Sequence, residues 1–139
     1  MEEKHISQVA EIEKMCFSTP WSENSLREEL ANDVARFFVF TEGDEVLGYA
    51  GMHSLSGECY IDNIAVNPSH RRQKIGYCLT EKLIETAMSE KAEFITLEVR
   101  KSNEAAISLY EKLGFENVGV RKNFYDKPTE DAVIMTKTL

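Results

Sequence analysis

Apolar residues recur at helical spacing in four parts of the chain. They lie three or four residues apart in segment 7–17, and again in a short segment after Ser22, a residue type that caps helix N-termini. Two longer amphipathic stretches follow at 75–89 and 103–112. The sequence therefore predicts four helices.

Runs of β-branched and aromatic residues fill most of the remaining chain and predict strands. They lie at 36–41, 46–53, 58–66 and 94–99. Segment 115–139 reads as two more strands around a polar loop. The resulting order, α-α-β-β-β-α-β-α-β-β, predicts an α/β (α+β) fold with helices on both faces of one sheet, and residues 1–139 fit a single domain.

Charge and composition narrow the classes of function. The chain has 16 basic and 24 acidic residues, a net charge of −8, which disfavours general nucleic-acid binding but allows a local anion site or a basic substrate. No apolar run could span a bilayer and no secretory signal is visible, so we expect a cytoplasmic protein without a membrane partner. The cysteines form no C-x-x-C pair and the histidines no H-E-x-x-H motif, so we expect no metal.

A basic segment, NPSHRRQKIGYCL (67–79), is a candidate binding site. It joins a predicted strand to the start of a predicted helix, where unpaired backbone N–H groups favour anions, and Arg71, Arg72 and Lys74 add positive charge. This combination suits a polyphosphate, although the pattern is neither a P-loop nor a dinucleotide-binding motif. On spacing alone, a solvated basic turn is the simpler interpretation.

Four blocks of sequence carry a resemblance to a known family. They are CFSTPWSENSL (16–26), NIAVNPSHRRQKIG (63–76), LEVRKSNEAAISLYEKLGF (97–115) and FYDKPTEDAVIM (124–135). With them the chain resembles the GCN5-related N-acetyltransferase (GNAT) family, and within it the RimI-like branch, which acetylates the N-terminal alanine of a small-subunit ribosomal protein. The resemblance implies the GNAT fold, a mixed and mostly antiparallel sheet in which two parallel strands splay apart and acetyl-CoA binds between them.

The resemblance implies two main groups of acetyl-CoA contacts. Ile64, Ala65 and Val66 would bind the pantetheine arm through their backbone, although their side chains alone indicate core positions. The loop and first helical turn that would surround the pyrophosphate comprise Arg72, Gln73, Lys74, Ile75, Gly76 and Tyr77. Asn103, whose place before a helix indicates an N-cap, also matches a cofactor contact of the branch.

The pyrophosphate loop departs from the family pattern, because Lys74 stands where a glycine is usual. If that glycine supplies only a backbone N–H, Lys74 changes little and adds charge near phosphate. If the position requires a positive φ or a close approach of the backbone to the ligand, Lys74 weakens cofactor binding. The first alternative is favoured, because the other elements of the motif are present.

Two residues match the catalytic groups of the family. Glu98 matches the base that takes a proton from the acceptor amine, which must be neutral before it attacks a thioester. Tyr110 matches the acid that hydrogen-bonds the CoA sulfur and protonates the departing thiolate. The amine attacks directly, without a covalent enzyme intermediate. Taken without the resemblance, Glu98 is an ordinary acid on a strand face and Tyr110 a core aromatic.

The resemblance implies a role in substrate recognition for only a short part of the chain. Tyr125 matches a tyrosine that hydrogen-bonds the acceptor peptide, whereas Phe124 lacks the hydroxyl usual at its position. The resemblance thus implies an acetyl-CoA-dependent transferase that acts on a protein N-terminus, and the acidic net charge fits a basic ribosomal tail. An enzyme of the same fold acting on a small-molecule amine or a lysine side chain, and a non-catalytic acyl-CoA-binding module, stay open as alternatives. The sequence does not predict the oligomeric state.

Overall fold

The computed structural model of the protein describes residues 1–71 and 73–139. The helices are α1 (Ile6–Cys16), α2 (Glu23–Glu29), α3 (Ile75–Ser89) and α4 (Glu104–Lys112), with short 3₁₀ turns at Glu3–His5 and Pro68–His70. The strands are β1 (Ala35–Glu42), β2 (Glu45–Leu55), β3 (Glu58–Val66), β4 (Phe94–Arg100), β5 (Glu116–Tyr125) and β6 (Glu130–Thr138). This order of elements confirms the order that the sequence predicts.

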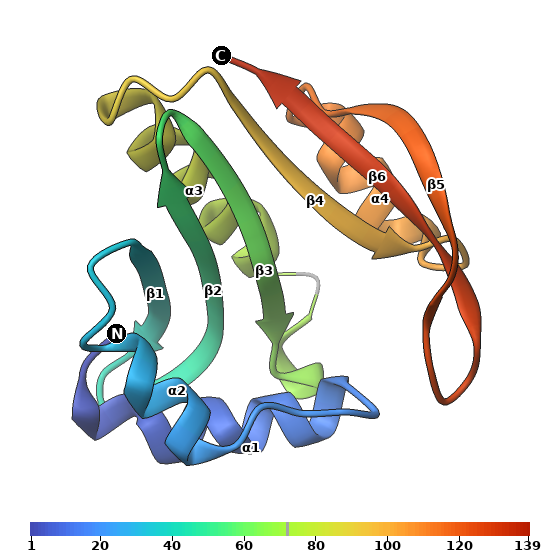
Figure 1. The fold of residues 1–139 in the computed structure, drawn as a ribbon. Coiled ribbons are helices and arrows are strands. Elements are labelled where there is room, and N and C mark those ends of the chain that lie inside the picture. Colours follow the sequence, from blue (N-terminus) through green and yellow to red (C-terminus); the bar gives the residue numbers. More distant parts are fainter. Residues whose placement is uncertain (72) are drawn as a thin grey trace.

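All six strands form one sheet in the order β1-β2-β3-β4-β6-β5 (Figure 1). Neighbouring strands are antiparallel except β3 and β4, which pair in parallel. That parallel pairing joins only Glu58–Tyr60 to Phe94–Thr96. Beyond it β3 stays paired with β2, and β4 stays paired with β6, so the two strands diverge (Figure 1). The predicted mixed sheet with a splayed parallel pair is confirmed.

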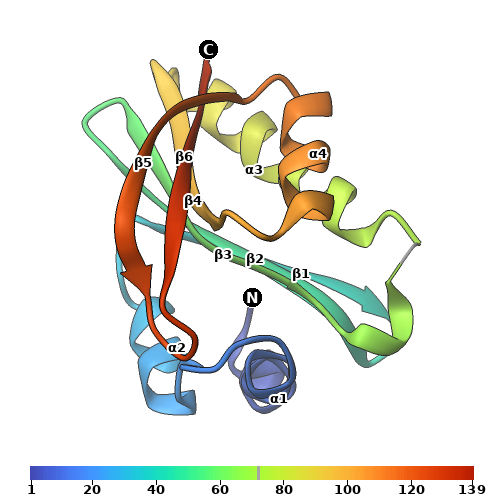
Figure 2. The same ribbon diagram turned by 90° about the vertical axis from the view of Figure 1, so that its right-hand side faces the viewer.

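Helices cover both faces of the sheet, with α1 and α2 on one side and α3 and α4 on the other (Figure 2). Leu83 of α3 packs in one buried cluster with Ile95 of β4. Ile12, Leu26 and Tyr49 bring α1, α2 and β2 together in the second cluster. Each fully buried aliphatic side chain contributes about 2 kcal/mol to this packing.

Side chains along β4 point alternately to the two faces of the sheet, and this decides which of them reach the face covered by α1 and α2. Ile95, Leu97 and Val99 are buried in the cluster beneath α3 and α4. Successive strand residues point to opposite faces, so Glu98 projects toward the face that α1 and α2 cover.

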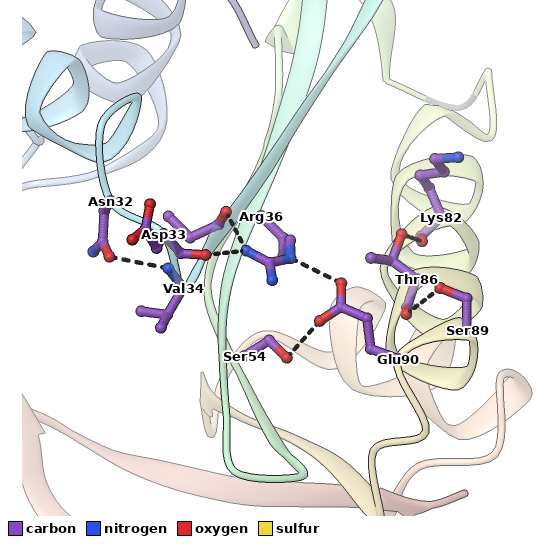
Figure 3. A network of polar contacts seen from close by, with 10 residues as sticks. Asn32, Asp33, Val34, Arg36, Ser54, Lys82, Thr86, Ser89 and Glu90 are labelled. Carbon is purple, nitrogen blue, oxygen red and sulfur yellow. Dashed lines mark hydrogen bonds and ion pairs between the residues drawn. The ribbon is translucent and has the colours of Figure 1, made fainter.

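A polar network fastens one edge of the sheet to the C-terminal end of α3 (Figure 3). Arg36 Nε of β1 forms an ion pair with Glu90 Oε2 at 2.8 Å, and Ser54 Oγ of β2 donates to Glu90 Oε1 at 2.8 Å. The Arg36–Glu90 pair is partly exposed, so it contributes about 1 kcal/mol or less. Within residues 1–71 and 73–139, none of the helices has both the length and the apolar character that crossing a bilayer requires.

Candidate active site

A cleft of about 810 Å³ lies where β3 and β4 part. Its walls are the two strands, the loop between α1 and α2, the loop between β5 and β6, and one side of α4. Strand edges that no longer pair leave N–H and C=O groups in need of partners. A ligand rich in amide groups, lying between the strands, could supply those partners.

The cleft brings together five of the predicted site residues. They are Ile64, Glu98, Asn103, Tyr110 and Tyr125. The predicted N-cap is also present, because the Asn103 side chain accepts a hydrogen bond from the Ala106 N–H at 3.2 Å. Residues from three separate parts of the chain thus meet in one place.

The other predicted cofactor residues that the structure describes lie beyond the lining of this cleft. Ala65 and Val66 continue β3 past it, and the Ala65 side chain is buried in the cluster beneath α1. Gln73 and Lys74 are exposed just before α3. Arg72 lies outside the described residues.

The N-terminus of α3 has the geometry of an anion site. Its first intrahelical bond runs from the Cys78 N–H to the Lys74 carbonyl at 3.0 Å. The N–H groups of Ile75, Gly76 and Tyr77 therefore precede the helical ladder and point outward at the positive end of the helix dipole. Ile75 is buried in the core, so only its backbone is available to a ligand.

Lys74 adopts the left-handed conformation, with a φ of 59°. The sequence analysis favoured the alternative in which the usual glycine supplies only an N–H group, and the structure corrects it. The chain does turn through positive φ here, and an L-residue with a side chain is disfavoured in that region by about 1 kcal/mol.

Glu98 is held by an ion pair that the sequence analysis missed. Its Oε1 lies 3.1 Å from Arg121 Nε on β5, while 31% of the Glu98 side chain stays exposed. Arg121 thus contacts one carboxylate oxygen of Glu98, and the Glu98 side chain lines the cleft.

Two tyrosines of the cleft hold their protons firmly. Tyr110 is buried against Phe115, with ring centroids 5.7 Å apart. Burial raises the pKa of Tyr110, and the nearby Tyr125 raises it further by a smaller amount. Burial also raises the pKa of Tyr125, to about 12, with a further contribution from the negative charge of Glu98. Both phenols are therefore hydrogen-bond donors at neutral pH.

Arg100 holds the β5–β6 loop over the cleft. Its guanidinium lies 4.5 Å from the centre of the Tyr125 ring, and it donates to the carbonyl oxygens of Pro128 and Asp126 at 3.0 and 2.9 Å. The Ser18 hydroxyl donates to the same Asp126 oxygen at 3.4 Å, so the two loops meet across the cleft. The sequence analysis did not single out Arg100.

A buried carboxyl group anchors the opposite wall. Glu13 of α1 is fully buried and accepts from the Tyr49 hydroxyl at 2.7 Å, the Trp21 N–H at 2.9 Å and Asn63 Nδ2 at 3.2 Å. Burial raises the pKa of Glu13, and the hydrogen bonds from Trp21 and Tyr49 oppose that shift. This network fixes the α1–α2 loop to β2 and β3. An isolated glutamate on an otherwise apolar helical stripe could have signalled it.

A mixed sheet whose parallel strands part beside a cleft is the fold expected of an N-acetyltransferase of the GNAT class. The chain belongs to this family, since residues 6–115 match the Acetyltransferase (GNAT) family. The predicted family and the predicted enzyme class are confirmed.

Two relatives and one solved structure illustrate the match. The chain is 38% identical over 130 residues to the [ribosomal protein bS18]-alanine N-acetyltransferase of Escherichia coli (strain K12), covering 89% of this chain and 84% of that one. Identity to the enzyme of the same name from Haemophilus ducreyi is 33% over 138 residues, covering 96% and 93%. The crystal structure of the ribosomal-protein-S18-alanine N-acetyltransferase from Escherichia coli superposes with a TM-score of 0.91 at 33% identity, covering 99% and 90% of the two chains.

The conformation of Lys74 leads to a prediction about stability. Lys74→Gly and Lys74→Ala both remove the ammonium group, but only glycine relieves the left-handed backbone. We expect Lys74→Gly to exceed Lys74→Ala in free energy of unfolding by about 1 kcal/mol, measured by urea denaturation. Equal stabilities would show that position 74 does not need a positive φ in solution.

Proposed function

We propose that the chain transfers the acetyl group of acetyl-CoA to the N-terminal α-amine of a protein, and that its substrate is the N-terminal alanine of ribosomal protein bS18. One observation carries the proposal: the parting of β3 and β4 opens into a cleft that gathers Glu98, Tyr110 and Tyr125. The relatives named for this reaction support the choice of acceptor. Residues 1–139 would act as a single catalytic domain.

The chain offers acetyl-CoA two kinds of backbone contact. The free edge of β3 at Ile64, Ala65 and Val66 suits the amides of the pantetheine arm. The N–H groups of Ile75, Gly76 and Tyr77 at the start of α3 suit the pyrophosphate, with Gln73 and Lys74 just before them, and Asn103 lines the cleft. When bound, acetyl-CoA supplies an acetyl group activated as a thioester.

Glu98 is the proposed base. An α-ammonium group has a pKa of about 8, so most acceptor molecules arrive protonated at neutral pH and must lose a proton before they react. The Glu98 carboxylate lines the cleft, and it takes that proton directly or through a water molecule.

Tyr110 is the proposed acid. Its buried phenol keeps its proton at neutral pH and can donate a hydrogen bond to the sulfur as negative charge develops there. Burial also makes a free phenolate costly, so any proton that Tyr110 gives up must be replaced promptly. The second proton of the acceptor nitrogen is a suitable source.

The loops that close the cleft provide the acceptor site. Tyr125 has a phenol that can donate to the peptide backbone, and Arg100 holds its ring in place. Trp21, fixed by Glu13, contributes to the opposite wall. A basic peptide tail would be attracted by the net charge of −8.

A competition assay tests the acceptor. The protein and acetyl-CoA are mixed with two peptides of one basic sequence, one with a free N-terminal alanine and one with that amine blocked and a lysine retained. We expect only the first peptide to gain the mass of an acetyl group in a mass spectrum. Modification of the blocked peptide would reassign the enzyme to lysine, and no modification of either would refute a peptide acceptor.

Removing the proposed base should slow the reaction without weakening cofactor binding. We expect Glu98→Gln to lower kcat at neutral pH about 100-fold, with the KM for acetyl-CoA unchanged, because a neutral amide cannot accept the ammonium proton. Glu93→Gln, at an exposed position just before β4, is the matched control and should behave as wild type. Wild-type rates in Glu98→Gln would remove Glu98 from the mechanism.

Removing the Tyr110 hydroxyl should affect the chemical step more than binding. We expect Tyr110→Phe to lower kcat about tenfold or more in steady-state kinetics, because a hydrogen bond to developing charge is lost. The ring still packs against Phe115, so the melting temperature and the Kd for CoA should change little. An unchanged kcat would contradict the acid role.

A further inference from the structure

The β3 strand contains a β-bulge next to the cleft. In the pairing of β2 with β3, Met52 lies opposite Ile61 and Gly51 lies opposite Asn63, so Asp62 is an extra residue. A bulge re-aims the side chain it carries. Asp62 and Asn63 both line the cleft, and the bulge lies just beyond the last parallel pair, Tyr60 with Thr96.

Asp62 is in contact with His53, and Glu29 contacts the other side of the same imidazole ring. Asp62 Oδ2 contacts Nδ1 of His53 on β2, and Nε2 of the same ring lies 2.9 Å from Glu29 Oε2 on α2. Burial lowers the pKa of His53, but the contacts with Glu29 and Asp62 outweigh it and raise the pKa. The imidazole therefore favours its protonated form, which orients the Asp62 carboxylate.

The charges around Asp62 leave room for one more cation. Carboxylates from three elements face the site: Asp62 from β3, Glu29 from α2 and Glu98 from β4, with His53 as the cation between the first two. Burial raises the pKa of Asp62 to about 6; His53 opposes that shift, while Glu29 and Glu98 add to it. His53 and Arg121 are the two cations paired with these three carboxylates, so the group keeps one negative charge that no contact within it balances.

We propose that Asp62, positioned by His53 and Glu29, binds the α-ammonium group of the acceptor peptide as it enters the cleft. The assignment rests on the proposed function and adds a residue to it. Asp62 selects acceptors that carry a positive charge at the N-terminus, and Glu98 then removes the proton. Recognition and deprotonation thus belong to different carboxylates of one cleft.

A binding experiment separates this role from the chemistry. The protein with CoA, which carries no acetyl group, is titrated with a peptide that begins with alanine and with the same peptide in which a propionyl group replaces that alanine. The two peptides differ only in the amine. We expect wild type to bind the amine peptide about tenfold more tightly, Asp62→Asn to bind both equally, and Asp44→Asn, the same change in the β1–β2 turn, to keep the preference.

Steady-state kinetics test the same assignment. We expect Asp62→Asn to raise the KM for the peptide about tenfold, with kcat and the KM for acetyl-CoA nearly unchanged. His53→Gln should raise the peptide KM by a smaller factor, because its amide can still donate to Asp62 but no longer joins it to Glu29. The melting temperatures of both variants report whether the fold is kept.

Three results would overturn the proposal. They are equal binding of the two peptides by wild type, a retained preference in Asp62→Asn, and a loss of kcat without a change in peptide KM in that variant. Failure of the wild-type protein to acetylate the alanine peptide is a different outcome. It would refute the proposed function, whatever the binding preference of Asp62.

Discussion

The parallel pairing of β3 with β4 stops after three residues, and the positions of the proposed catalytic and acceptor-binding groups depend on that interruption. The two strands can part because each is paired on its other side from end to end, β3 with β2 and β4 with β6. The separation therefore removes only the backbone hydrogen bonds that β3 and β4 would otherwise form with each other beyond Tyr60 and Thr96. The same separation places β4 side chains that face α1 and α2, among them Glu98, at the edge of an open space instead of against a neighbouring strand.

The walls of the cleft are fixed by two ionisable side chains, Glu13, which is buried, and Arg100, which is partly exposed. Glu13 ties the α1–α2 loop to the sheet through hydrogen bonds from Trp21, Tyr49 and Asn63, and Arg100 ties down the β5–β6 loop through two backbone carbonyls. Removing the Glu13 carboxyl group would leave its hydrogen-bond donors without an acceptor, at a cost of about 1–3 kcal/mol for each one that is buried, so this anchor restricts the α1–α2 loop. Such loops can present Tyr125 and Trp21 to a peptide at little further entropic cost.

Much of this arrangement is readable from the sequence where local spacing decides it. The order of elements, the Ser22 and Asn103 caps and the burial of alternate β4 residues follow from contacts between near neighbours. Glu98, Tyr110 and Tyr125 were found through the resemblance, because a glutamate on a strand or a tyrosine on a helix has no distinctive local pattern. Pairings such as Glu98 with Arg121 join distant parts of the chain and left no signal. The bulge at Asp62 shifts by one residue the alternation of β3 side chains between the two faces of the sheet. Lys74 has a positive φ, although residues with a side chain favour a negative one. Both features depart from the local rules by which the sequence is read.

Asp62 can bind the acceptor amine while Glu98 deprotonates it, because acetylation changes the charge of the acceptor. A cationic amine gains from contact with Asp62, whose negative charge is only partly balanced by His53. Once Glu98, the proposed base, has taken a proton the amine is neutral, and the amide that forms is neutral as well. The attraction that draws the substrate in is therefore absent for the product, so the Asp62 site favours entry of the amine without retaining the acetylated peptide. A carboxylate that both bound the cation and removed its proton would be neutralised at the moment of reaction, and separating the two tasks avoids this.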